Sequence, residues 1–214
     1  YAVSALARFG TDDAAVARVL EALRDDFWRV RVLALEAVAE LEIQQAEPAV
    51  AFMVRSDPEV RVRTEAAQTL AALGGAAAWE QLERTFSDPR APRDLRLSAL
   101  EQLVRGAESG SSQAILEAAL AEEGQPNSQL LPAIASRLAA TGNPVYEPLW
   151  ARLMTSSEVT LVLIAIRAVG EAGLSQYRER LEGWVTGRNS SPVIVRTASD
   201  ALEALGFPIP ERPE

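Results

Sequence analysis

Apolar residues recur along the chain with the period of an α-helix. In the segment from Val62 to Leu73 they fall at offsets 0, 4, 5, 8 and 11, which places them on one stripe of a helix. Gly74 follows directly, and glycine at this position favours the left-handed conformation in which many helices end. Alternating β-branched runs are absent from the sequence, which argues against a β-sheet.

The same stripe occurs six times in full. The copies begin at Val30, Val62, Leu95, Leu130, Leu161 and Ile194, and a truncated copy spans Ala2 to Gly10. Their final positions are Phe9, Leu41, Leu73, Gly106, Thr141, Ala172 and Leu205, so successive copies lie 31 to 35 residues apart. Another helical segment precedes each full copy, at residues 14–24, 46–55, 76–86, 113–122, 145–154 and 176–186. Each repeat is therefore predicted to hold a first helix, called A, and a second helix, called B.

One repeat of about 33 residues cannot bury its stripe alone, whereas stacked repeats bury each other's stripes. The sequence thus predicts an all-α fold, a right-handed α-α superhelix of about six helix pairs after a partial N-terminal repeat. We expect residues 1–206 to form a single solenoid and the Pro-rich residues 207–214 to form a tail or linker, because proline cannot continue a helix. Tyr1 falls inside a B helix of the partial repeat, and we expect more sequence upstream of it.

The turns between A and B helices carry a charged motif. Asp57-Pro58 and Asp88-Pro89 predict an aspartate at the N-cap and a proline at the first helical position. Asp25 precedes Arg31 by six residues, and Asp57 precedes Arg63 by the same distance.

This motif resembles the HEAT-repeat family, and the short period is similar to the bacterial HEAT-like repeats of phycobilin lyases. The resemblance implies that turn aspartates and B-helix arginines form a ladder along the stack. In the fourth unit, Arg90-Ala91-Pro92 lengthens the turn. In the last three units the arginine position holds Leu131, Val162 and Val195, so we expect apolar packing alone to hold the C-terminal half together.

Composition narrows the chemistry that the chain can support. It contains no His and no Cys, which removes the side chains most used for acid–base and thiol chemistry near neutral pH. The 21 basic residues are all arginine, which excludes a Schiff-base lysine and a P-loop lysine. We therefore expect a protein that is not an enzyme, with no catalytic residues, no cofactor and no metal site.

Three features of the sequence could indicate a functional site, but each has a simpler structural interpretation. Glu117, Glu122 and Glu123 could form a carboxylate cluster, but scattered surface glutamates are the simpler interpretation. The segment 109–112 has the composition of a phosphate loop without its Gly-Lys-Ser ending, which indicates a link between repeats. The four tryptophans could mark an interface, but their irregular spacing favours packing within or between repeats.

The resemblance implies that the B helices line the concave face of the stack. Offsets 3, 6, 7 and 10 of each B helix are then expected to face the groove. The groove residues predicted in this way are Leu33, Glu36, Glu40, Glu65, Gln68, Glu101, Arg105, Arg137, Arg167, Glu171 and Asp200. Acidic residues prevail in the N-terminal half, and Arg137 and Arg167 lie in the other half, so a peptide, helix or protein carrying both charges would fit. A simply solvated helix face remains the alternative.

The sequence therefore predicts a non-catalytic scaffold that binds a protein or peptide. One alternative is a HEAT-scaffold enzyme of the DNA-glycosylase or bilin-lyase kind, and another is a structural or regulatory spacer. No signal peptide and no run of about 18 apolar residues is visible; this favours a cytoplasmic location without establishing it. The oligomeric state stays open.

The net charge of -9 predicts that the chain does not bind duplex DNA, because nucleic-acid binders need a basic surface against the phosphates. In a gel-shift assay at low salt we expect no shift of duplex DNA. Tight binding that weakens steeply with added salt would instead favour the DNA-glycosylase alternative.

Overall fold

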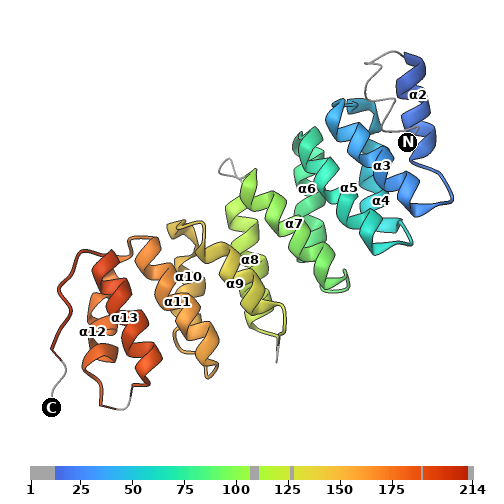
Figure 1. Ribbon diagram of the computed structural model, residues 1–214. Helices are drawn as coiled ribbons and strands as arrows, with labels where there is room; N and C mark the ends of the chain where they lie inside the picture. The colour runs from blue at the N-terminus through green and yellow to red at the C-terminus, as the bar shows by residue number, and fades with distance from the viewer. Residues whose placement is uncertain (1–12, 107–110, 126–127, 189, 212–214) are drawn as a thin grey trace. The chain divides into compact units, whose positions relative to one another are not determined.

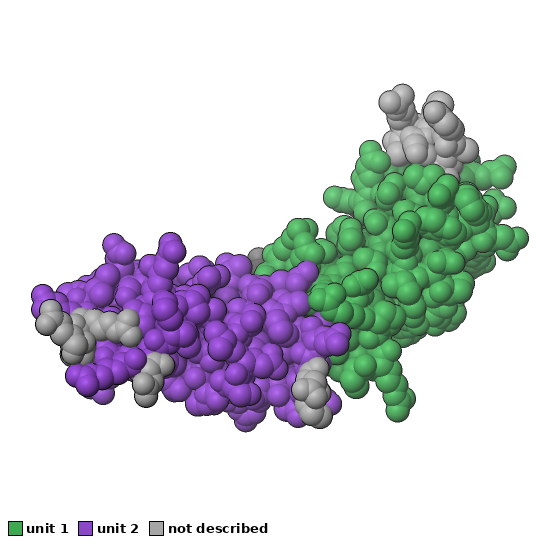
Figure 2. All heavy atoms as spheres, turned by 60° about the horizontal axis from the view of Figure 1, so that its bottom comes forward, with its two compact units in different colours: residues 1–111 green, residues 112–214 purple. Residues whose placement is uncertain are grey.

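The computed structural model describes residues 13–106, 111–125, 128–188 and 190–211. Every regular element in this part of the chain is a helix (Figure 1). The chain divides into two compact units, Tyr1–Ser111 and Ser112–Glu214 (Figure 2). The partial repeat predicted at residues 2–10 and the end of the predicted tail, residues 212–214, lie outside the described residues.

The described residues of unit 1 form three helix pairs. Its helices are α2 (Asp13–Ala22), α3 (Trp28–Glu40), α4 (Glu47–Ser56), α5 (Val60–Leu73), α6 (Ala76–Ser87) and α7 (Arg93–Arg105), and a short 3-10 helix (Gln44–Ala46) precedes α4. Each A helix packs on the B helix that follows it. The B helices α3, α5 and α7 also pack on one another in order, and so form one layer (Figure 1).

Unit 2 follows the same plan. Its helices are α8 (Ser111–Glu123), α9 (Leu131–Ala139), α10 (Glu147–Leu153), α11 (Val159–Glu171), α12 (Arg178–Thr186) and α13 (Pro192–Ala204), with 3-10 helices at Pro144–Tyr146 and Ser175–Tyr177. The B helices α9, α11 and α13 again pack side by side. The predicted all-α fold and the predicted positions of the helix pairs are confirmed over the described residues.

The apolar stripes form the core. In α5, Val62, Ala66, Ala67 and Leu70 are completely buried. Alanine recurs at the middle of the stripe, and its small side chain lets neighbouring helices approach closely. Gly74, which follows α5, has a positive φ of 71°, as predicted, but its ψ of −160° places it outside the left-handed helical region, in a conformation open essentially to glycine alone.

Gly106 occupies a stripe position that is apolar in most other repeats. A Cβ atom on this residue would lie 2.1 Å from the ring of Trp79 in α6. The indole of Trp79 therefore fills the space that a leucine side chain fills elsewhere. Gly170 of α11 also allows a close approach, because it has no side chain. A Cβ atom on this residue would lie only 3.1 Å from the backbone of Ala201 in α13.

The turn aspartates are not helix N-caps, contrary to the prediction. The helix α5 begins at Val60, and α7 begins at Arg93, so each aspartate lies before its helix. Asp57 Oδ1 instead accepts a hydrogen bond from the backbone N–H of Glu59 at 2.9 Å. Asp88 does the same with Arg90, and Asp25 with Phe27. These Asx turns fix the carboxylates in the turn.

One rung of the expected arginine–aspartate ladder is fully formed. Arg31 Nε and Nη2 each donate to one carboxylate oxygen of Asp57 in the next repeat, both at 2.8 Å. Arg31 Nη1 donates to the backbone carbonyl of Asp25, also at 2.8 Å. The side chains of Arg31 and Asp57 are only 10% and 6% exposed. The pKa of Arg31 is raised, chiefly by its hydrogen bond with Asp57 and against the effect of burial.

The equivalent rung between Arg63 and Asp88 is not formed, since the described residues contain no ion pair within 4.0 Å joining them. Asp57 lies three residues before the start of α5, whereas Asp88 lies five residues before the start of α7. The longer turn therefore changes the approach of Asp88. Further along, Arg96 Nε donates to the carbonyl of Phe86 at 2.8 Å.

The expectation that apolar packing alone holds the C-terminal half is wrong. In unit 2, Arg152 of α10 reaches Glu123 of α8 at 3.1 Å. The hydroxyl of Tyr177 donates to Glu147, which begins the preceding A helix. Burial first, and then the bond to Glu147 and its charge, raise the pKa of Tyr177 to about 12. Polar contacts between A helices therefore replace the ladder where its arginines are missing.

Replacing Arg31 by alanine should leave the buried carboxylate of Asp57 without its counter-ion. We expect the free energy of unfolding to fall by about 3 kcal/mol or more, measured by urea denaturation followed by circular dichroism. Arg18→Ala is the matched control, because Arg18 pairs with Glu21 on the open surface and should cost about 0.5 kcal/mol. Equal losses in the two variants would contradict a structural role for the Arg31–Asp57 rung.

Candidate functional site

The predicted groove residues all lie on the accessible side of their B helices. Seven of them lie on α3, α5 and α7 of unit 1, and the other four lie on the B helices of unit 2. Exposed members are Glu36, Glu40, Gln68, Arg105, Arg167, Glu171 and Asp200, and half-buried members are Leu33, Glu65, Glu101 and Arg137. This surface of the B helices is called the B face below.

At offset 7 the prediction is wrong in four of the six repeats, whereas Gln102 and Arg137, which occupy this offset in the other two, are half-buried and remain accessible. Ala37, Thr69, Ala168 and Ala201 occupy this offset and are buried. Seven residues make nearly two complete helical turns, so offset 7 lies beside offset 0 within the apolar stripe. Thr69 uses its buried position structurally, since its hydroxyl donates to the carbonyl of Leu35 in α3 at 3.2 Å.

Two glutamates from neighbouring helices meet on the B face of unit 1. Glu36 lies on α3 and Glu65 on α5. The pKa of Glu65 is raised, first by burial and then by repulsion from Glu36. Neither carboxylate has an ion pair within the described residues. The structure thus brings together a pair of acids that the sequence placed 29 residues apart.

The acidic character does not extend to α7. Glu101 accepts an ion pair from Arg105 one turn later, at 2.5 Å, and the two charges offset each other. This pairing follows from their i,i+4 spacing, a signal in the sequence that the prediction of an acidic half-groove overlooked. The acidic part of the B face in unit 1 therefore consists of Glu36, Glu40 and Glu65.

On the B face of unit 2, Arg137 Nη1 donates to the carbonyl of Ala133 on its own helix, at 3.2 Å. Arg167 and Glu171 are exposed on α11. The two units are described separately, so a single groove that changes sign along its length stays a prediction.

The other candidates of the sequence are dispersed. Glu117 accepts a hydrogen bond from Gln113 at 3.1 Å, Glu123 pairs with Arg152, and Glu122 accepts one from Ser128. Their carboxylates therefore face different partners rather than one shared site. Within the described residues no group of three acidic, histidine or cysteine side chains gathers as a metal ion would need.

The tryptophans differ in their surroundings. Trp150 is 1% exposed and belongs to the core of unit 2, as expected for packing. Trp28 is the first residue of α3 rather than part of a turn, and the guanidinium of Arg61 lies 5.5 Å from its ring centre. Trp184 carries Arg180 over its ring at 5.4 Å. These cation–π contacts account for the partly exposed rings.

Sequence reasoning missed a polar pocket of about 630 Å³ in unit 1. Its wall is formed by the ends of α4 and α6, by α5, and by the turn that leads into α7. The lengthened turn at residues 90–92 was the visible signal in the sequence, but its length alone gave no reason to expect a cavity.

Comparison with known proteins agrees with this architecture. Residues 16–104 match the family model described as HEAT repeats, and this stretch lies within unit 1. The HEAT resemblance predicted from the Asp–Arg motif is confirmed there. No curated protein sequence matches the chain significantly.

Two solved structures resemble the chain in fold. An engineered protein of the Northeast Structural Genomics Consortium is 18% identical, with 92% of this chain and 97% of that chain covered and a TM-score of 0.48. The complex of CpcE and CpcF of phycocyanin lyase from Nostoc sp. PCC7120 is 20% identical, with coverages of 95% and 88% and a TM-score of 0.46. None of the helices described for this chain combines the length and hydrophobicity that a membrane span requires.

The raised pKa of Glu65 makes a prediction about pH. A carboxyl whose folded-state pKa is raised destabilises the fold once it ionises, so its protonated form favours folding and this advantage is lost as pH rises. Glu65→Gln should therefore be more stable than the wild type at pH 7, and the difference should shrink toward pH 4. Thermal unfolding across this range measures it.

Glu36→Gln removes the neighbouring charge. In a chain that carries this substitution, Glu65→Gln should therefore have a smaller effect on stability than it has in the wild type. Glu21→Gln, on the outer surface of α2, is the control and should show no such pH-dependent difference. A pH-independent effect of Glu65→Gln would contradict the like-charge pair.

Proposed function

We propose that this protein is a non-catalytic binding scaffold whose acidic B face in unit 1 takes a positively charged segment of a partner protein. The observation that carries the proposal is the half-buried carboxylate of Glu65 beside Glu36, without a cation from the described residues. Two like charges held together on packed helices raise the free energy of the unbound protein. A cationic side chain inserted between them relieves that repulsion.

The geometry favours a helix or an extended peptide as the partner segment. Glu36 and Glu40 lie one turn apart on α3, and Glu65 lies on the adjacent helix α5, so the charges cover two neighbouring helices. Half-buried Leu33 lies one turn before Glu36 and offers apolar contact beside them. Arginine or lysine residues one helical turn apart in the partner would match this pattern.

The non-catalytic character is supported by the chemistry of the chain. The whole sequence has no His, Cys or Lys, the side chains most often used for proton transfer, nucleophilic attack and Schiff-base formation near neutral pH. The HEAT repeats over residues 16–104 also suit a scaffold, because repeat stacks present extended binding surfaces.

On unit 2, we propose a second surface that includes Arg137 and Arg167. These arginines would bind acidic side chains of a partner protein. Glu171 and Asp200 complete this second surface.

Charge reversal tests the proposed face. The double variant Glu36→Arg and Glu65→Arg should lose proteins that the wild-type chain captures from cell extract, with a loss of about tenfold or more in recovered partner because repulsion replaces attraction. Quantitative mass spectrometry of the captured proteins measures the loss.

The matched control is Glu21→Arg, which reverses an exposed glutamate on an A helix of the same unit. It should capture the same proteins as the wild type. If the double variant and the control capture the same set in equal amounts, the B face is not the binding surface, and a spacer role becomes the better account.

A further inference from the structure

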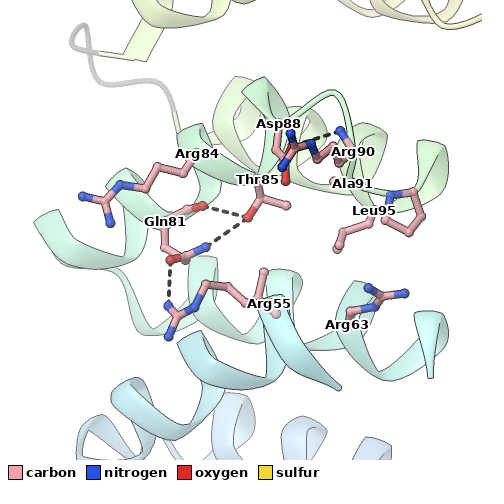
Figure 3. Close-up of a pocket in the computed structure, with 11 residues that line it drawn as sticks. Arg55, Arg63, Gln81, Arg84, Thr85, Asp88, Arg90, Ala91 and Leu95 are labelled. Atoms are coloured by element: carbon pink, nitrogen blue, oxygen red, sulfur yellow. Dashed lines mark hydrogen bonds between the residues drawn. The ribbon is translucent and has the colours of Figure 1, made fainter. Parts of the chain in front are cut away.

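We propose that the polar pocket in unit 1 is a binding site for the phosphate group of a small phosphorylated molecule. The residues that carry the proposal are Arg55, Arg63 and Arg90 with the Gln81–Thr85 pair (Figure 3). The pocket lies at the A helices and the A–B turn, apart from Glu36 and Glu65 of the B face. Its test is therefore independent of the function proposed above.

The pocket arises where the arginine–aspartate ladder is interrupted. Arg31 is held by both oxygens of Asp57 and by the carbonyl of Asp25. Arg63 occupies the same position one repeat later, but Asp88 forms no ion pair with it. The two extra residues between Asp88 and its helix account for the difference. The space that a rung would close remains open as a cavity of about 630 Å³.

The guanidinium of Arg63 is left with unused donors. Its Nε is buried and has no hydrogen-bond partner. A buried N–H without an acceptor is costly, and more so on a charged group. The side chain of Arg90, across the pocket, also has no ion pair among the described residues. The buried Nε of Arg63 is closed to a ligand, so an oxyanion in the pocket would accept hydrogen bonds from the Nη groups of Arg63 and Arg90.

The third arginine is positioned by a buried polar chain. Arg55 Nη1 donates to Gln81 Oε1 at 2.9 Å, and Gln81 Nε2 donates to the hydroxyl of Thr85 at 3.2 Å. Thr85 in turn donates to the carbonyl of Gln81 at 2.8 Å. Gln81 is neutral, so it orients Arg55 without cancelling its charge. Arg55 thus keeps its positive charge at the pocket wall.

Charge balance identifies the class of ligand. Four arginines and one acid line the pocket, in a chain whose net charge is -9. Arg84 extends away from the others in Figure 3 and pairs with Glu80, which leaves three available cations. One oxygen of Asp88 is already bound to the N–H of Arg90.

Phosphate suits these groups better than a single carboxylate does. Guanidinium groups bind phosphate through pairs of parallel hydrogen bonds. Arg55, Arg63 and Arg90 lie at separate parts of the pocket wall in Figure 3, which suits a ligand with several phosphate oxygens better than a single carboxylate. The 13-residue helix α7 begins at Arg93, next to lining residue Pro92, and helix N-termini favour anions. A pocket of this volume lies within the range of small-molecule sites, so it can hold more than a bare phosphate ion.

Isothermal titration of the full chain with sodium pyrophosphate, at constant ionic strength in chloride buffer, tests the site. We expect saturable binding at one site per chain. Arg63→Gln and Arg90→Gln should each weaken it by about tenfold or more, because each removes charge-assisted hydrogen bonds. Arg18→Gln, a surface arginine elsewhere in unit 1, should bind as the wild type does.

A second measurement needs no variant. Phenylglyoxal modifies accessible arginines, and bound pyrophosphate should protect Arg63 and Arg90 at least threefold more than Arg18, as read by mass spectrometry. Three results would overturn the proposal: no saturable binding, equal weakening in all three variants, or uniform protection of all arginines. Binding of a phosphoserine peptide without binding of pyrophosphate would also overturn it, since the ligand would then be a protein.

Discussion

The stripe of small and branched apolar side chains on each B helix must be covered by the next B helix. Every other feature of the two units follows from this requirement. The helices α3, α5 and α7 pack side by side because alanines at the middle of the stripe allow close approach, and the missing side chain of Gly170 does the same between α11 and α13. Since the stripes occupy the contact surfaces, polar chemistry is confined to the B face and to the turns.

The period of the sequence was enough to predict the helices because burial imposes it directly. The A and B helices lie where the apolar offsets placed them, and the glycine after Leu73 has the expected positive φ. Local chemistry was harder to predict. Asp57 has the sequence context of an N-cap, but Arg31 from the preceding repeat binds its carboxylate, and no local signal identifies that partner.

The candidate binding surfaces were also harder to predict from the sequence than the helices were. Offset 7 was misplaced in the four repeats that carry alanine or threonine there, because two helical turns return a residue to the buried stripe. The sequence could have corrected this geometric error. The pair Glu36 and Glu65 could be proposed as two members of one face, but only the packing of α3 on α5 brings their charges close enough to repel each other. Arg63 shows the opposite case, since the sequence assigns it a ladder partner that the longer turn removes. Side-chain partners between repeats depend on turn geometry, which the helical period does not encode.

The turn between α6 and α7 can affect what this chain binds without affecting how it folds. Its length can change without disturbing any stripe, because the residues that differ lie outside the helices. The turn before α7 is two residues longer than the turn before α5, and it borders a cavity where the shorter turn forms an internal ion pair. Repeat proteins of this kind can therefore acquire a new ligand through the insertion of a few turn residues. No substitution in the buried stripes, which would destabilise the fold, is required. Repeat proteins whose helices carry the same apolar stripes but whose turns differ in length should therefore share a fold and differ in the ligands that they bind.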